Sequence, residues 1–159
     1  MTIDRREMLV GGALLGALAG AGVGAPAHAL PPTAAPPGLM EVLNIHVGAD
    51  GKSQVRRVKV YGARKPIPAV SVEASSIGPG DGAWGNPPSK RFSVNTIGDL
   101  ESELGDGTKV RIGKGDLVFI EDLTGSGHFS RFLTAVANVY IVVADDFDLL
   151  EWAGNPPGD

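Results

Sequence analysis

From about residue 40 onward, the apolar residues of the chain follow the spacing of β-strands and not that of helices. Successive side chains of a strand point to opposite faces, so apolar and polar residues tend to alternate. Each apolar segment here is short and is bounded by Gly, Pro or Asp, which favour turns. The pattern predicts strands at residues 42–47, 55–60, 69–74, 91–97, 100–104, 109–112, 117–121, 128–133 and 139–143.

Two glycine-containing segments predict hairpin turns between neighbouring strands. They are Gly-Ala-Asp-Gly at 48–51 and Gly-Asp-Gly at 105–107. Residues 100–104 could form a helical turn, but their two glutamates fall on one side at a period of two, which favours a strand. The one helix we expect is short, at 145–152. Many short strands with closely spaced turns indicate an all-β domain, an antiparallel β-sandwich or barrel.

The first 29 residues have the layout of a signal peptide. Arg5 and Arg6 are followed by an uncharged, only mildly hydrophobic run at 10–27, and the pair resembles the twin-arginine export motif. Small residues at 27 and 29 predict cleavage after Ala29 and a periplasmic or secreted protein. The alternative is a retained membrane anchor, because a run of this length can just span a bilayer.

The rest of the chain divides into three parts. Residues 30–39 contain four prolines and predict an extended linker, 40–152 form the β-domain, and 153–159 form a flexible tail. A chain of 159 residues leaves room for one such domain in addition to the signal peptide.

Composition narrows the classes of function. The chain has 14 basic and 18 acidic residues and a net charge of −4, so it lacks the basic surface that nucleic-acid binding requires. It contains no cysteine, which excludes disulfides, thiolate metal ligands and cysteine nucleophiles. After cleavage we expect no stable membrane anchor, and an edge strand of the sheet offers a route to a homodimer.

The spacing of residues 78–98 resembles the first motif of the cupin family. That motif has a glycine, five residues, His-x-His, four residues, a glutamate, six residues and a glycine. Here the frame is kept, but the ligand positions hold Trp84, Asn86 and Arg91. The second motif is kept in outline at 107–116, and His128 falls where the family places its last metal ligand.

Two segments resemble a subgroup of small bacterial cupins. Residues 121–128 read Glu-Asp-Leu-Thr-Gly-Ser-Gly-His, and residues 84–91 are a degraded form of the subgroup's Trp-His-x-Ala-Pro-x-Arg-Gln. The resemblance covers about residues 41–145. It implies a cupin-type barrel, a jelly-roll-like double-stranded β-helix with a central pocket.

The substituted ligand positions predict a pocket without a metal ion or other cofactor. A cupin metal is held by imidazole nitrogens and a carboxylate. Trp84 cannot ligate, Asn86 offers a weak neutral oxygen, and Arg91 would repel a cation. His128 alone supplies one ligand, whereas a stable site needs three or four.

We therefore expect Arg91 to bind an anionic group of a small molecule, with Asn86 and His128 as hydrogen-bond partners and Trp84 as an apolar wall. The competing interpretation is that Arg91 pairs with Glu121 or points to solvent, and that His128 is a strand histidine whose hydrogen bonds are satisfied.

Whether the protein is an enzyme stays open at this point. One alternative is a metal-independent isomerase, lyase or cyclase with His128 or Glu121 as acid or base. Adjacent strand residues point to opposite faces, so only one of Glu121 and Asp122 can face the pocket, and we expect Asp122 to start the turn. The other alternative is a metal-dependent oxygenase whose ligands lie at unrecognised positions.

Overall fold

The computed structural model describes residues 40–62 and 64–154. The predicted signal peptide at 1–29, its cleavage site after Ala29, the linker at 30–39 and residues 155–159 of the predicted tail lie outside these described residues. In the described part of the chain, no helix is both long and apolar enough to cross a membrane.

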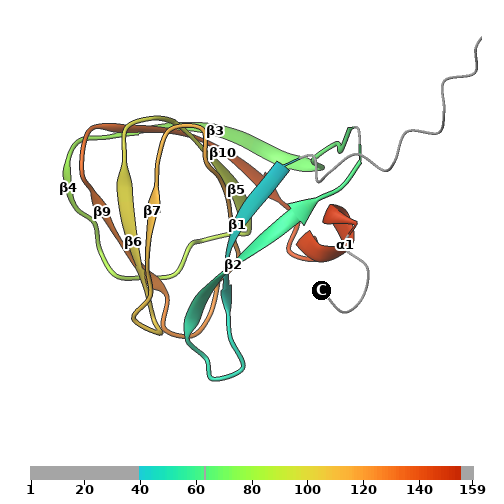
Figure 1. The fold of residues 1–159 in the computed structure, drawn as a ribbon, viewed down its shortest axis with the longest axis horizontal. Coiled ribbons are helices and arrows are strands. Elements are labelled where there is room, and N and C mark those ends of the chain that lie inside the picture. The colour runs from blue at the N-terminus through green and yellow to red at the C-terminus, as the bar shows by residue number, and fades with distance from the viewer. Residues whose placement is uncertain (1–39, 63, 155–159) are drawn as a thin grey trace, which may run out of the picture. The chain divides into compact units, whose positions relative to one another are not determined.

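The described residues form two β-sheets and one short helix (Figure 1). The larger sheet has six strands in the order β2-β1-β8-β5-β10-β3, and the smaller has four in the order β4-β9-β6-β7. All strand pairs are antiparallel except β1 with β8. The strands are β1 (Met40–Val47), β2 (Ser53–Val60), β3 (Ala69–Ile77), β4 (Gly80–Asp81), β5 (Arg91–Ile97), β6 (Leu100–Leu104), β7 (Lys109–Ile112), β8 (Leu117–Ile120), β9 (His128–Phe132) and β10 (Val136–Val143), and the helix is α1 (Leu149–Ala153).

This architecture confirms the predicted all-β sandwich. Every predicted strand overlaps an observed one, and the hairpin turns at 48–51 and 105–107 join β1 to β2 and β6 to β7. The two-residue strand β4 was not predicted, because it contains only Gly80 and Asp81 and has no apolar alternation.

The helix begins later than the sequence predicts. The side chain of Asp148 accepts hydrogen bonds from the main-chain N–H groups of Leu150 and Glu151, at 2.8 and 3.0 Å. It is therefore the N-cap, and the helix runs from Leu149 to Ala153 instead of from residue 145. Gly154 ends the helix in the left-handed conformation.

The six-stranded sheet buries apolar side chains on both of its faces. On β8, Val118 and Ile120 pack in a cluster that also includes residues of β6 and β7, whereas Phe119 belongs to a second cluster with α1. This alternation follows from the period of two along a strand. One face therefore closes the space between the two sheets, and the other is covered by the C-terminal segment.

Aromatic rings hold the C-terminal segment against the sheet. The Phe92 and Phe119 rings lie 4.6 Å apart between centroids, and Phe147 and Trp152 pack against Phe92 at 5.7 and 5.3 Å. The indole N–H of Trp152 donates to the carbonyl of Pro66 at 2.8 Å. Such aromatic contacts stabilise the outer layer beyond the burial of their area.

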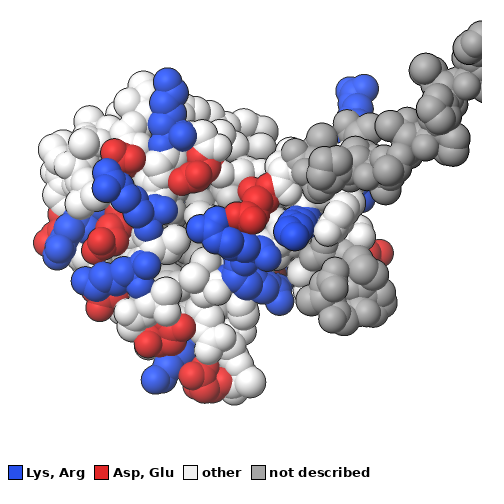
Figure 2. Space-filling view, in the orientation of Figure 1, with Lys and Arg blue, Asp and Glu red and all other residues white. Residues whose placement is uncertain are grey.

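The surface charges are mixed. On the face in Figure 2, basic and acidic groups lie next to one another. Several form exposed ion pairs, such as Arg111 with Asp99 at 3.2 Å and Arg131 with Asp81 at 2.7 Å. The hydrogen bond from Arg131 to Asp81 is the main cause that raises the pKa of Arg131, and the pair joins β9 to β4. Isolated exposed pairs of this kind contribute little to stability.

The outermost strands of the larger sheet are β2 and β3. On β3, Val70 and Val72 are 69% and 64% exposed. Dimerisation through an edge strand stays a prediction, and β3 is the strand with the most exposed apolar side chains for it.

Candidate functional site

A cavity of about 330 Å³ lies where β5, β8, β9 and β10 meet the segment at 83–87. All four residues that the sequence predicts as ligand-binding line it: Trp84, Asn86, Arg91 and His128. The remaining lining residues are Ala83, Gly85, Pro87, Ile120, Ser130 and Tyr140. The volume lies at the lower end of the range usual for small-molecule sites.

Main-chain hydrogen bonds hold the wall at 82–86 against β9. The N–H of Gly82 donates to the carbonyl of Ser130 at 2.8 Å. Gly85 and His128 exchange two N–H···O=C bonds, each 3.0 Å long. The segment that carries Trp84 and Asn86 therefore lies beside the strand that carries His128, although they are about forty residues apart in sequence.

Gly127 makes this close approach possible, and Gly125 makes a second one, to the turn between β1 and β2. Gly127 has a φ of +67°, and a Cβ atom there would lie 2.5 Å from the carbonyl oxygen of Gly85. Gly125 has a φ of +76°, and its Cβ would lie 2.3 Å from the carbonyl oxygen of Gly51. Only glycine combines this left-handed backbone with such short contacts. The Gly-x-Gly-His sequence is thus a packing requirement of the loop before β9.

Arg91 begins β5, and its half-buried side chain lines the cavity. Its Nε donates to the carbonyl of Ser89 at 3.3 Å, and one terminal nitrogen donates to the Ser89 hydroxyl at 2.9 Å. The guanidinium carbon lies 5.3 Å from the centroid of the Tyr140 ring, a cation–π distance. Within residues 40–62 and 64–154, Arg91 forms no ion pair with a carboxylate.

Glu121 does not pair with Arg91, contrary to the competing interpretation. Its carboxylate lies 3.6 Å from Arg56 and 4.0 Å from Lys90, and it accepts a 3.0 Å hydrogen bond from Asn44. Ile120 lines the cavity, so the next residue points to the opposite face of the sheet. The structure therefore does not bring Glu121 to His128.

Asp122 is the acidic residue beside His128. Its side chain is fully buried, and its Oδ2 lies 2.9 Å from Nδ1 of His128, whose side chain is 15% exposed. The same Oδ2 accepts a hydrogen bond from the hydroxyl of buried Ser53 at 2.7 Å. Asp122 lies in the loop that follows β8, as expected, and this loop also turns its carboxylate inward, which the sequence did not predict.

The Asp122 bond leaves Nε2 of His128 as the second ring nitrogen, and it has no partner among the described residues. A carboxylate on Nδ1 fixes the orientation of the ring. The view that the hydrogen bonds of His128 are satisfied thus holds for Nδ1, while the ring still lines the cavity.

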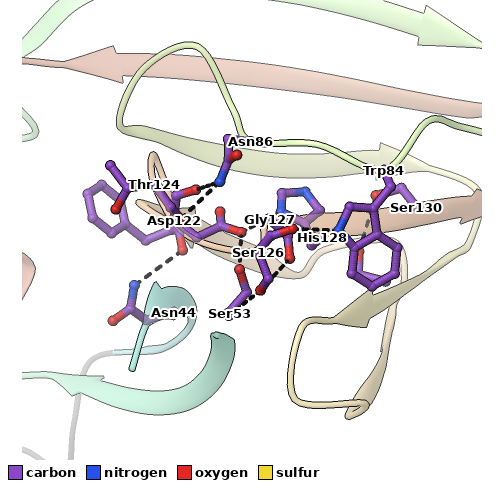
Figure 3. Close-up of polar contacts among 12 residues, drawn as sticks. Asn44, Ser53, Trp84, Asn86, Asp122, Thr124, Ser126, Gly127, His128 and Ser130 are labelled. Atoms are coloured by element: carbon purple, nitrogen blue, oxygen red, sulfur yellow. Dashed lines mark hydrogen bonds and ion pairs between the residues drawn. The ribbon is translucent and has the colours of Figure 1, made fainter. Parts of the chain in front are cut away.

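Asn86 lines the cavity, but its side chain mainly holds the loop between β8 and β9. Its side-chain amide nitrogen donates to the carbonyls of Asp122 and Thr124, at 2.7 and 3.0 Å (Figure 3). Since an amide NH₂ has two hydrogens, both are already used, and only the oxygen can face a ligand. Arg91 and His128 are therefore the better donors for an anion.

Trp84 is fixed at the rim. It is 48% exposed, its ring stacks on Phe129 at 6.3 Å between centroids, and its indole N–H donates to the carbonyl of Ser126 at 2.5 Å (Figure 3). The ring is an apolar wall with its one polar group already bonded.

The residues at the positions that the sequence resemblance implies for metal ligands do not fit a metal ion. Trp84 and Arg91 offer no lone pair, and the only imidazole lining the cavity is that of His128. In the part of the chain that the structure describes, no three His, Asp or Glu side chains are grouped as metal ligands would be.

Sequence reasoning did not identify Ser130 and Tyr140 as lining residues. Ser130 follows His128 at a period of two on β9, which places both side chains on the same face. Tyr140 lies opposite Ser93 on β5, two residues beyond Arg91. The position of both residues at the cavity follows from strand register once the order of the strands is known. The sequence pattern alone does not predict that order.

The chain is an all-β sandwich with a cavity that is lined by both polar and apolar residues. No protein-family model matches it, and no curated protein matches it. Among solved structures it resembles the crystal structure of protein NMB1881 from Neisseria meningitidis, with a TM-score of 0.40 and 18% identity over 52% of this chain and 84% of that chain. So slight a likeness adds nothing to the description of the fold or the site.

Proposed function

We propose that the protein is an exported, cupin-like domain that binds a small anionic molecule in the cavity lined by Arg91 and His128. The observation that supports this most is the environment of Arg91. Its guanidinium lines the cavity and forms no ion pair with a described carboxylate. A half-buried cation without a counter-ion favours an anionic ligand, because the charged hydrogen bond offsets its desolvation.

The other walls of the cavity suit a compact carboxylate or phosphate. The planar guanidinium can donate two parallel hydrogen bonds to either group. His128 adds a second donor or acceptor, while Trp84 and Ile120 supply apolar surface. The substituted ligand positions support binding without a metal ion.

The cupin assignment is supported by the motif spacing. The first motif's frame, residues 78–98, runs through the wall at 82–86 and β5, and the second motif's turn at 113–116 precedes β8. Residues from both motif regions meet at the cavity, as Arg91 and His128 do. The jelly-roll form of the barrel belongs to this proposal. So does export to the periplasm or medium through the twin-arginine segment.

A second candidate function is a metal-independent isomerase or lyase, and the Asp122–His128 pair favours it. Nε2 of His128 would take a proton from a substrate carbon beside the bound anion and return it at another position. Asp122 would hold the ring and stabilise the imidazolium that forms in between. Glu121, which does not line the cavity, takes no part in this version.

Thermal stability in the presence of anions tests the binding proposal. We expect hexanoate or inorganic phosphate at millimolar concentration to raise the melting temperature of the wild type and not that of Arg91→Gln. The matched control is Lys90→Gln, which removes a neighbouring cation that points to the opposite face and bonds to Phe147 and Glu121.

Lys90→Gln should lower the starting melting temperature and keep the anion response. The binding proposal fails if no anion stabilises the wild type, or if Arg91→Gln and Lys90→Gln respond alike.

A further inference from the structure

A smaller cavity of about 90 Å³ lies next to the first, deeper between the two sheets. The two cavities share four lining residues, Ile120, His128, Ser130 and Tyr140, so they are adjoining parts of one site. We call the smaller one the inner chamber. Its other lining residues are Ile45, Ser93, Leu100, Ser102, Ile112, Val118, Phe132 and Asn138.

Strand register places a row of polar side chains from the outer cavity into the inner chamber. On β10, Tyr140 and Asn138 are two residues apart, so their side chains point to the same face. Tyr140 lies opposite Ser93, and Asn138 lies opposite Asn95. Arg91 lies over the Tyr140 ring at the outer end of this row. A ligand that binds Arg91 therefore has Tyr140 and Asn138 directly beneath it.

The side-chain oxygen of Asn138 is the buried polar atom of this chamber that lacks a hydrogen-bond partner among the described residues. Asn138 is only 4% exposed, and its Oδ1 makes no hydrogen bond to any described residue. Its amide nitrogen donates to the Tyr140 hydroxyl at 3.3 Å. A buried carbonyl oxygen without a donor costs about 1–3 kcal/mol, so such groups normally have a protein, water or ligand partner.

Tyr140 complements this free acceptor with a free donor. Its oxygen accepts from Asn138, and its own proton has no acceptor among the described residues. The chamber thus presents an O–H donor beside a C=O acceptor. A ligand hydroxyl satisfies both, because it donates one hydrogen bond and accepts another.

The charge of the chamber excludes an ionic occupant. No Lys, Arg, Asp or Glu lines it. The hydroxyls of Ser102 and Ser130 lie 3.3 Å apart and add neutral donors and acceptors. A neutral polar group is therefore the best match.

We propose that the inner chamber is a hydroxyl-binding subsite, and that the ligand is a small hydroxylated carboxylate whose anionic end contacts Arg91. This assignment rests on the proposed anion-binding function. It adds a specificity determinant, the pair Asn138 and Tyr140, which distinguishes hydroxylated acids from plain fatty acids of the same length.

Three probes of six carbons separate the contributions of the two parts of the site. Gluconate has a carboxylate and hydroxyls, hexanoate has the carboxylate alone, and sorbitol has hydroxyls alone. Titration calorimetry on the wild type should show gluconate binding about tenfold tighter than hexanoate, a difference of about 1.4 kcal/mol, which is within the range of one additional hydrogen bond.

Tyr140→Phe keeps the ring beneath Arg91 and removes the hydroxyl, so the ratio of the two affinities should fall towards one. Asn138→Leu should have the same effect on the ratio, and it provides a second test should one variant not fold. The matched control is Tyr61→Phe, which removes the chain's other tyrosine hydroxyl away from the cavity and should keep the wild-type ratio.

The outcomes distinguish this inference from the proposed function. Equal affinity of the wild type for gluconate and hexanoate, both dependent on Arg91, means that the chamber holds only water; it overturns the subsite and leaves anion binding intact. If neither acid binds and sorbitol binds in a Tyr140-dependent manner, the chamber is supported as a hydroxyl site and the anion function fails. Absence of binding by all three probes overturns both.

Discussion

The carboxylate of Asp122 and the imidazole of His128 are joined by a hydrogen bond of 2.9 Å, and the carboxylate is completely buried. The two residues are six positions apart, at the two ends of the loop between β8 and β9. The bond therefore fixes this loop and orients a ring of the cavity wall at the same time. Ser53 on β2 bonds to the same carboxylate oxygen and ties the loop to the first hairpin.

We expect Asp122→Asn to lower the free energy of unfolding by about 1–3 kcal/mol, because it weakens two buried hydrogen bonds to a charged group. Urea titration measures the change. Asp145→Asn is the matched control, since Asp145 is exposed, and it should change stability by less than about 0.5 kcal/mol. Equal effects of the two substitutions would show that the Asp122 carboxylate contributes nothing to the fold.

A double-mutant cycle isolates the pair itself. Asp122→Asn and His128→Gln should be non-additive, with a coupling energy of about 0.5–3 kcal/mol, because the two side chains are in direct contact. The cycle of Asp122→Asn with His46→Gln is the control, since among the described residues the ring of His46 bonds only to the carbonyl of Val47. Additive effects in both cycles would contradict the pairing.

The period of two and the turn residues were enough to predict every β-strand except β4, because most of these strands have one face that is more buried than the other. The convergence of Trp84, Asn86, Arg91 and His128 was predicted by the resemblance of their spacing to the cupin motif, not by periodicity. The role of Asp122 could not be predicted in this way. It depends on β8 ending at Ile120, so that the following carboxylate turns inward, and strand ends are decided by tertiary pairing.

The inner chamber could not be predicted from the sequence for a similar reason. Asn138 and Tyr140 lie on a strand whose apolar residues predict burial of both faces, and nothing local marks them as a pair facing a cavity. Their role appears only when β10 is placed between β5 and β3.

The N-cap of α1 gives a prediction for the outer layer. Asp148→Ala should lower the free energy of unfolding by about 1 kcal/mol, because two main-chain N–H groups lose their acceptor. Tryptophan fluorescence should report the change, since Trp152 packs on Phe92 and Phe147. Asp148→Asn retains a capping oxygen and should keep most of the stability. A loss as large as that of the alanine variant would contradict the capping role.

The proposed twin-arginine signal peptide predicts a defined mature protein. Expressed in a bacterium with twin-arginine transport, the protein should be found outside the cytoplasm with Leu30 as its first residue, as intact-mass measurement would show. Replacing both Arg5 and Arg6 by Lys keeps the charge and should leave the uncleaved chain in the cell. Export of the double-lysine variant at the wild-type level would contradict a twin-arginine route, and a wild type that keeps residues 1–29 would favour the retained anchor.

Alanine substitutions at Gly127 and Gly107 separate two contributions to the free energy of unfolding. One is the close contact of Gly127 with the cavity wall, and the other is the strain of a left-handed backbone. Gly127→Ala should lower the free energy of unfolding by more than about 2 kcal/mol, because a Cβ in the left-handed region is strained and would also lie 2.5 Å from the carbonyl oxygen of Gly85. Gly107→Ala is the matched control. Gly107 has a φ of +86° but no atom within 4 Å of its Cβ position, so only the backbone strain of about 1–2 kcal/mol applies.

The difference between the two alanine variants therefore measures the contact between the loop before β9 and the segment that carries Trp84 and Asn86. Gly127→Ala should also weaken anion binding, because the displaced segment forms one wall of the cavity, whereas Gly107→Ala should not. Equal losses of stability in the two variants, with anion binding unchanged in both, would mean that the contact of Gly127 with Gly85 does not position the wall.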